Sequence, residues 1–229
     1  MKESGKHLLL FDIDGTLMTS GGAGEGALRD AMKDRFGVDE DLSGITVAGA
    51  TDTLIARLLL KKHGLAITPE NITALLDRYL HFLQERIGRH KGYLLPGILE
   101  LLSQLARNPY CVTALLTGNL KKGAEIKLSH YGIWEFFQFG AFADDHHHRN
   151  ELGHFARTRA RESHGYDFLP REIFVIGDTP RDVACGKEIG ARTVAIATGN
   201  YSVEVLRAEN PDFVFQDLSD IDAVMSVLL

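Results

Sequence analysis

The chain has 229 residues, 45% of them hydrophobic, so it can form one large domain, or one domain with a smaller insert, around a substantial core. Its net charge of −6 and the lack of a basic stripe argue against a nucleic-acid-binding protein. Two cysteines are too few for a disulfide framework, so we expect a reduced, cytoplasmic setting. The apolar run before Asp12 is too short for a signal-peptide core or a membrane span, and no membrane partner is expected.

The most informative motif follows the first predicted strand, residues 8–11, where Asp12 and Asp14 flank Ile13. Side chains two residues apart on an extended segment point the same way, so both carboxylates can reach one point in space. Two carboxylates held together repel unless a cation or a shared proton relieves them. Gly15 permits a sharp turn just after the pair. Open α/β sheets bind ligands at the carboxyl ends of their strands, so the pair predicts a functional site; the plainer alternative is a solvated turn.

Apolar runs of strand length alternate with helical patterns along most of the chain. This alternation predicts βαβ units and a mostly parallel sheet, and therefore an α/β fold. The later predicted strands are residues 112–116, 137–142, 173–176, 193–197 and 213–215, and predicted helices between them include 98–106 and 121–131.

One interval, residues 19–93, interrupts this alternation. It contains helical patterns at 27–36, 53–63 and 69–87 and no convincing strand. The glycine- and proline-containing segments 21–24 and 88–96 at its borders have the composition of hinges. We therefore predict a helical insert between the first and second strands of the sheet, which leaves from the active-site edge and could cover it.

Thr117, Gly118 and Asn119 follow the strand at 112–116 and precede a helix. A hydroxyl, a glycine and free backbone N–H groups at a helix start suit a phosphate oxygen. Asn119 is a plausible N-cap of that helix. Many helices begin with similar turns, so this motif alone is weak evidence for a phosphate-binding site and becomes informative only together with the other motifs.

A third strand-end carboxylate, Asp178, follows the strand at 173–176, and Asp182 comes four residues later at a helix start. Aspartates that end separate βα units provide hard oxygen ligands for one small cation. Mg²⁺ favours a few carboxylates together with water and a substrate phosphate. Asp182 could equally well cap the helix that it begins.

Arg149 lies in an acidic and histidine-rich segment, residues 144–151, after the third sheet strand. A cation is needed to offset the charge of a phosphate beside several aspartates, and Arg149 is a candidate by position. The alternative is a surface salt bridge with the local acids. His146, His147 and His148 suggest a transition-metal site by composition, but consecutive loop residues rarely face one point, so we favour solvated or hydrogen-bonded histidines.

Together these motifs resemble the haloacid dehalogenase superfamily of phosphotransferases, in the same order and over nearly the whole chain. The segments Asp-x-Asp-Gly-Thr from Asp12 and Gly-Asp-x-x-x-Asp from Gly177 are the most specific matches. The resemblance implies a Rossmann-like parallel sheet core, residues 1–18 and 94–229, with an inserted all-helical cap, residues 19–93. Phosphoglycolate-phosphatase-like enzymes and β-phosphoglucomutases have such a cap.

The resemblance also implies a role for each motif. Asp12 would be the nucleophile that forms an aspartyl-phosphate, and Asp14 the general acid and base. Thr117 and the backbone around Gly118 and Asn119 would hold the phosphoryl oxygens. The Mg²⁺ ligands would be Asp12, the backbone carbonyl of Asp14, and Asp178, with Asp182 as a direct or more distant contributor.

Two segments match the family less closely. The family's third motif usually has a lysine, and Arg149 is the best match here, although an arginine is bulkier and forked. Residues 49–52 resemble a cap loop of phosphoglycolate-type members, in which Thr51 and Asp52 would face the substrate. A helix N-cap at Thr51 or Asp52 explains these residues equally well.

The expected activity is Mg²⁺-dependent hydrolysis of a small-molecule phosphate ester. A receiver domain is disfavoured because its phosphoaccepting aspartate precedes the threonine, and a dehalogenase because it has no use for an acid at Asp14. A phosphomutase of the β-phosphoglucomutase type remains possible, because the same residues serve whether water or a sugar hydroxyl accepts the phosphoryl group. A non-catalytic phosphate sensor is the other alternative. The sequence specifies neither the substrate nor the oligomeric state.

Overall fold

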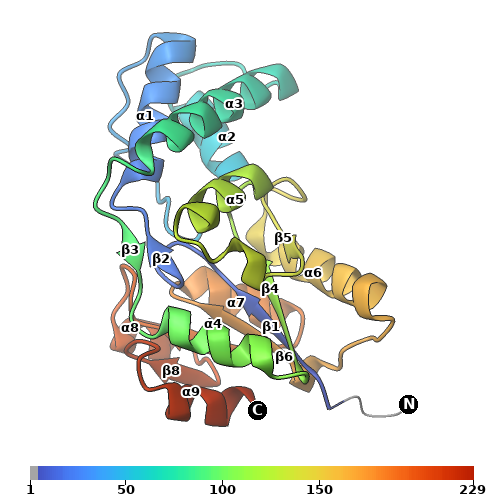
Figure 1. Ribbon diagram of the computed structural model, residues 1–229. Helices are drawn as coiled ribbons and strands as arrows, with labels where there is room; N and C mark the ends of the chain where they lie inside the picture. The colour runs from blue at the N-terminus through green and yellow to red at the C-terminus, as the bar shows by residue number, and fades with distance from the viewer. Residues whose placement is uncertain (1–4) are drawn as a thin grey trace.

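The computed structural model describes residues 5–229 and contains a six-stranded parallel sheet in the order β5-β4-β1-β6-β7-β8 (Figure 1). Each of its strands overlaps a predicted one, so the predicted α/β sheet is confirmed. The strand at 137–142 is shorter than predicted. The strands are β1 (His7–Phe11), β4 (Cys111–Leu116), β5 (Gly140–Ala141), β6 (Ile173–Gly177), β7 (Arg192–Ile196) and β8 (Phe213–Phe215).

Both faces of the sheet are covered by helices. Leu8 and Leu10 of β1 face α6 (Arg149–His164) and α7 (Pro180–Glu188), whereas Leu9 and Phe11 lie in the core cluster that includes the other helices. A strand buried on both faces needs an unbroken apolar run, which explains the sequence of β1. The helices on the second face are α4 (Ile98–Arg107), α5 (Lys121–His130) and α9 (Ile221–Leu228), and α8 (Val203–Ala208) packs against β7 and β8. Short 3₁₀ turns occur at Trp134–Phe136 and Pro170–Glu172.

The insert between β1 and β4 is mainly helical. Its helices α1 (Ala23–Phe36), α2 (Asp52–Lys62) and α3 (Pro69–Arg86) lie together at the top of Figure 1, and α1 packs along α3. None of them joins the main sheet, although α3 touches α5. The separation of core and cap as domains stays a prediction.

The borders of the insert differ from the expectation. Two short strands, β2 (Met18–Thr19) and β3 (Tyr93–Leu94), pair antiparallel, with Thr19 opposite Tyr93. The prediction that no strand lies between residues 19 and 93 is therefore wrong at both ends. A two-residue strand is too short to show an alternating pattern, so local sequence could not indicate it.

The central position of β1 brings the predicted motifs together. It pairs with β4 on one side and β6 on the other, and Phe11 aligns with Leu115 and with Ile176. The residues just after these strands therefore meet at one edge of the sheet. Within residues 5–229, no helix has both the length and the apolar character needed to cross a membrane.

Candidate active site

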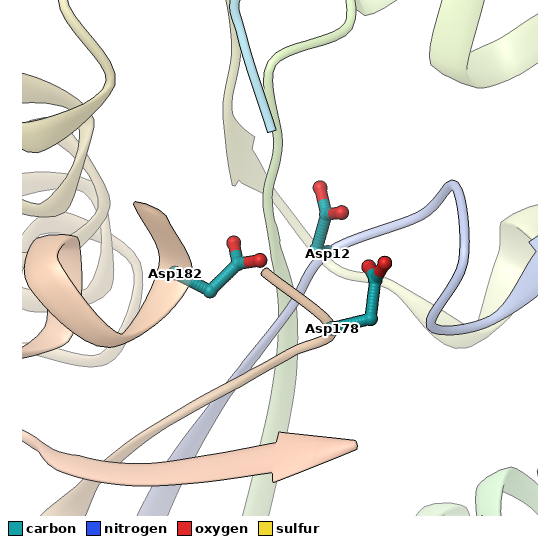
Figure 2. Close-up of side chains that lie close together, drawn as sticks. All are labelled: Asp12, Asp178 and Asp182. Atoms are coloured by element: carbon teal, nitrogen blue, oxygen red, sulfur yellow. The ribbon is translucent and has the colours of Figure 1, made fainter. Parts of the chain in front are cut away.

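Three buried aspartates converge at the carboxyl edge of the sheet. Asp12 follows β1, Asp178 follows β6, and Asp182 lies in the first turn of α7; Figure 2 shows their carboxylates approaching one another. Each offers an oxygen that lies within 4.8 Å of the others. The structure thus brings together three of the four residues that the sequence suggested as metal ligands.

The Asp178 carboxylate occupies a tight recess. Thr16 Oγ1 donates a hydrogen bond to Asp178 Oδ1 at 3.0 Å. A Cβ atom at either Gly15 or Gly199 would collide with this carboxylate, and Gly15 has a φ of +86°, a region that favours glycine. Burial raises the pKa of Asp178 well above its ordinary value, and the charges of Asp12 and Asp182 raise it further. The cluster therefore favours bound positive charge.

Arg149 supplies part of that charge. It is the first residue of α6, its side chain is only 5% exposed, and its guanidinium pairs with Asp12 Oδ1 at 2.8 Å and with Asp182 Oδ1. The alternative of a surface salt bridge with local acids is therefore wrong. Burial acts to lower the pKa of Arg149, but Asp12 and Asp182 raise it above the ordinary range. Its buried Nε has no hydrogen-bond partner within residues 5–229.

Asp182 has two structural tasks. Its Oδ2 accepts hydrogen bonds from Thr179 N at 3.0 Å and Thr179 Oγ1 at 2.7 Å, which confirms the predicted helix-capping role. Its Oδ1 accepts a hydrogen bond from Arg149. Both Asp182 oxygens thus already accept hydrogen bonds from other residues of the protein, although Asp182 belongs to the carboxylate cluster that could hold a metal ion.

Asp14 lines the same cavity as Asp12, and a lysine that the sequence analysis did not identify contacts it. Lys127 Nζ lies 2.6 Å from Asp14 Oδ2 and 2.6 Å from Asn119 Oδ1. Asn119 Nδ2 donates to the same Asp14 oxygen at 2.8 Å. The predicted N-cap role of Asn119 is wrong, because α5 has Leu120 at its N-cap and the Asn119 side chain bonds elsewhere. The missed signal is a lysine on the inward stripe of α5, between buried Ala124 and Leu128.

Thr117 and Gly118 lie between these groups and the insert. Thr117 is fully buried, and its Oγ1 accepts hydrogen bonds from the Asn119 backbone N–H at 3.3 Å and from Asn119 Nδ2 at 2.9 Å. A Cβ atom at Gly118 would collide with the Ala50 carbonyl. Gly118 O accepts a hydrogen bond from Asp52 N at 2.7 Å. Glycine at this position therefore allows the insert to approach the sheet closely.

The loop before α2 attaches the insert to the core. Thr51 is the N-cap of α2, as one of the two interpretations predicted, and Thr51 Oγ1 also donates to His147 O at 2.6 Å. Asp52 Oδ2 accepts a hydrogen bond from Leu120 N at 2.8 Å. Gly49 O accepts one from Arg149 at 3.2 Å. Of the two predicted substrate residues, Asp52 lines the adjacent cavity and Thr51 does not.

A cavity of about 330 Å³ lies between the sheet edge and the insert, large enough for a small metabolite. The core contributes Asp12, Asp14, Gly118, Asn119, Lys127, Arg149 and Asp178, and the insert contributes Gly22, Glu25, Leu28, Val47, Asp52, Ile55 and Tyr79 among others. Thr117 and Asp182 are not among the residues that line the cavity. The rings of His146, His147 and His148 lie against one another, and none of the three residues lines the cavity.

Comparisons with known proteins agree with this arrangement. A family model described as HAD-hydrolase-like matches residues 151–221. A probable phosphatase, IndB, of Dickeya dadantii is 25% identical, over 98% of this chain and 95% of that protein. A phosphoglycolate phosphatase of Vibrio vulnificus is 26% identical, over 96% of each chain. The crystal structure of a hydrolase from Pseudomonas syringae has the same fold, with a TM-score of 0.74, 22% identity, and coverage of 96% of this chain and 98% of that one.

Proposed function

We propose that this chain is a phosphatase of the haloacid dehalogenase superfamily, a Mg²⁺-dependent enzyme that hydrolyses a small phosphorylated metabolite through an aspartyl-phosphate. The observation that carries the proposal is the convergence of Asp12, Asp178 and Asp182 beside a cavity that also receives Asp14. Relatives that carry the name phosphoglycolate phosphatase support a small phosphate ester as the substrate.

In this proposal Asp12 is the nucleophile that attacks phosphorus, and Asp14 is the general acid and base. Asp12 Oδ2 makes no hydrogen bond or ion pair within residues 5–229, whereas Oδ1 pairs with Arg149, so one oxygen is available for attack. Asp14 protonates the departing alkoxide and then takes a proton from the water that cleaves the acyl-phosphate. Splitting the transfer into two displacements makes each easier for a weak carboxylate nucleophile.

Arg149, Thr117 and the backbone at Gly118 and Asn119 would bind the phosphoryl group. The unpaired, buried Nε of Arg149 is a donor that lacks an acceptor, and a phosphoryl oxygen would satisfy it. Charge-assisted hydrogen bonds of this kind strengthen as negative charge develops on the transferring group. Arg149 thus takes the place of the lysine that the family usually has.

The donor set fits a small hard cation. Asp12 and Asp178 are buried carboxylates whose pKa values are raised by burial and by the charges of neighbouring carboxylates, so bound positive charge would relieve both. Asp12, Asp178 and the Asp14 carbonyl would hold Mg²⁺, which offsets charge between the nucleophile and an anionic phosphate. Because both Asp182 oxygens are engaged, we assign Asp182 to positioning Arg149.

The test is phosphate release from a panel of phosphorylated metabolites, with Mg²⁺ and with excess chelator. We expect Mg²⁺-dependent turnover in the wild type and none in Asp12→Asn, whose amide cannot attack phosphorus usefully. Asp39→Asn is the matched control, because Asp39 is an exposed residue whose carboxylate pairs with Lys33, and neither residue lines the cavity. Near wild-type turnover in Asp12→Asn would show that the covalent mechanism is wrong.

A further inference from the structure

Lys127 makes contacts that the roles above leave unexplained. Its side chain is 4% exposed, and its ammonium group lies 2.6 Å from Asp14 Oδ2. Asn119 contacts both members of the pair. We propose that Lys127 is a positioning residue, which together with Asn119 fixes Asp14 through Oδ2 and leaves Oδ1 to exchange the proton with the leaving group. This inference rests on the proposed function.

Asp14 needs such a restraint. Its side chain is 41% exposed, and it lies in the turn after β1 rather than within a regular element. A carboxylate on a turn can rotate, whereas general acid catalysis requires the proton within hydrogen-bond reach of the leaving oxygen. Within residues 5–229, Oδ1 makes no hydrogen bond, and Oδ2 receives two. One oxygen is thus held and the other is left to react.

The restraint comes from a rigid part of the core. Lys127 lies in the second turn of α5, flanked on its inward stripe by Ala124 and Leu128, which are fully buried. Burying an ammonium group costs several kcal/mol unless it is paired and hydrogen-bonded. An ion pair with the half-exposed Asp14 carboxylate contributes little to the stability of the folded protein and so offsets little of that cost. The arrangement is therefore better explained by the position that it gives to Asp14.

A second explanation is that Lys127 acts on the phosphoryl group through its charge. The two explanations predict different dependence on the leaving group. A residue that positions the acid matters only when the leaving group needs a proton. A charge that stabilises the phosphoryl group matters equally for all esters.

The test compares benzyl phosphate, which releases an alkoxide, with 4-nitrophenyl phosphate, which releases a stable anion of similar size. The parameter is kcat/KM with Mg²⁺, because it reports the first displacement and not the hydrolysis of the acyl-phosphate. In Lys127→Met we expect a loss of about 10² in kcat/KM for benzyl phosphate and a loss of less than about tenfold for 4-nitrophenyl phosphate. Equal losses for the two esters, or no loss for benzyl phosphate, would overturn the proposal.

A double-mutant cycle shows whether Lys127 acts through Asp14. In an Asp14→Asn background, Lys127→Met should cause no further loss with benzyl phosphate; an additive loss would refute the proposal. Lys122→Met is the matched control, since Lys122 is an exposed lysine on the same helix that pairs with Glu125. If thermal melting shows that Lys127→Met is unfolded, Lys127→Gln is judged by the same criteria. Failure of the proposed function would look different, because the wild type would then hydrolyse neither ester.

Discussion

Replacing Asp52 by asparagine should change how the stability of the protein depends on pH. Asp52 is buried, and its Oδ2 accepts a hydrogen bond from Leu120 N across the boundary between the insert and the core. Burial raises the pKa of Asp52 from 3.8 to about 6, although Lys127 and the Leu120 N–H act to lower it. The folded protein therefore binds a proton here between about pH 4 and pH 6 that the unfolded chain has released.

The sign and size of the effect follow from that shift. A raised pKa in the folded state contributes stability that is complete below the unfolded value and is lost as the pH rises through the folded value. At 1.36 kcal/mol for each pKa unit, the whole shift is worth about 3 kcal/mol, and about 2.5 kcal/mol of this is lost between pH 4 and pH 7, because pH 4 already lies slightly above the unfolded value. Asp52→Asn keeps an oxygen for Leu120 N and cannot titrate. Its free energy of unfolding relative to wild type should therefore rise by about 2.5 kcal/mol across this range.

Urea denaturation of both proteins at pH 4 to 8, with chelator present, measures this difference. The other carboxylates of the site titrate in both proteins, so the difference between the two curves isolates Asp52. A difference that stays constant with pH would show that the Asp52 carboxylate is not held in a dehydrated site, and that the insert does not close on the core in the way that the structure shows.

Three further predictions concern the site and the insert. Arg149→Met leaves buried carboxylates without their cation, so it should destabilise the protein by about 3–5 kcal/mol in urea denaturation. It should also weaken vanadate binding, and Arg149→Lys should partly restore both stability and binding. Unchanged vanadate binding would exclude Arg149 from the phosphate site. Gly199→Ala places a methyl group against the Asp178 carboxylate and should weaken Mg²⁺ binding in calorimetry, whereas Gly88→Ala, where a Cβ atom makes only an ordinary contact with His130 Cε1 at 3.6 Å, should not. Replacing residues 19–93 with a short linker should leave a folded core that no longer discriminates among small phosphates; an unchanged preference would show that the insert does not select the substrate.

The carboxylate cluster could be predicted because sequence and topology agree there. Asp12 and Asp178 each follow an apolar run, and such runs form central parallel strands whose ends meet at one edge. Neither inference needs knowledge of a distant contact. The role of Arg149 could not be predicted in the same way, because its position after the third strand fits a phosphate-site cation and a surface residue equally well. Only its burial between Asp12 and Asp182 distinguishes these two interpretations.

The places of Lys127 and of the loop before α2 in the site are determined by long-range contacts, which local sequence patterns do not indicate. Lys127 is separated from Asp14 by 113 residues, and nothing in a helix pattern states which strand end it will face. Asp52 likewise meets Leu120 from 68 residues away. The family resemblance predicts one basic residue, in the segment 144–151, and gives no indication of a second cation in the site. A lysine on an otherwise apolar helix stripe is the signal that would have indicated it.

The charges around the cavity explain why cations are central to this site. Five carboxylates line it, those of Asp12, Asp14, Glu25, Asp52 and Asp178, against two cations, Lys127 and Arg149. Both cations already pair with carboxylates, so a phosphate dianion would meet net repulsion unless further positive charge were bound. We therefore expect inorganic phosphate to bind weakly when Mg²⁺ is removed by chelator and at least tenfold more tightly when Mg²⁺ is present, as calorimetry can measure. Equal affinity in the two conditions would mean that Arg149 and the backbone donors alone overcome the repulsion, and the proposed role of Mg²⁺ in holding the phosphoryl group would have to be abandoned.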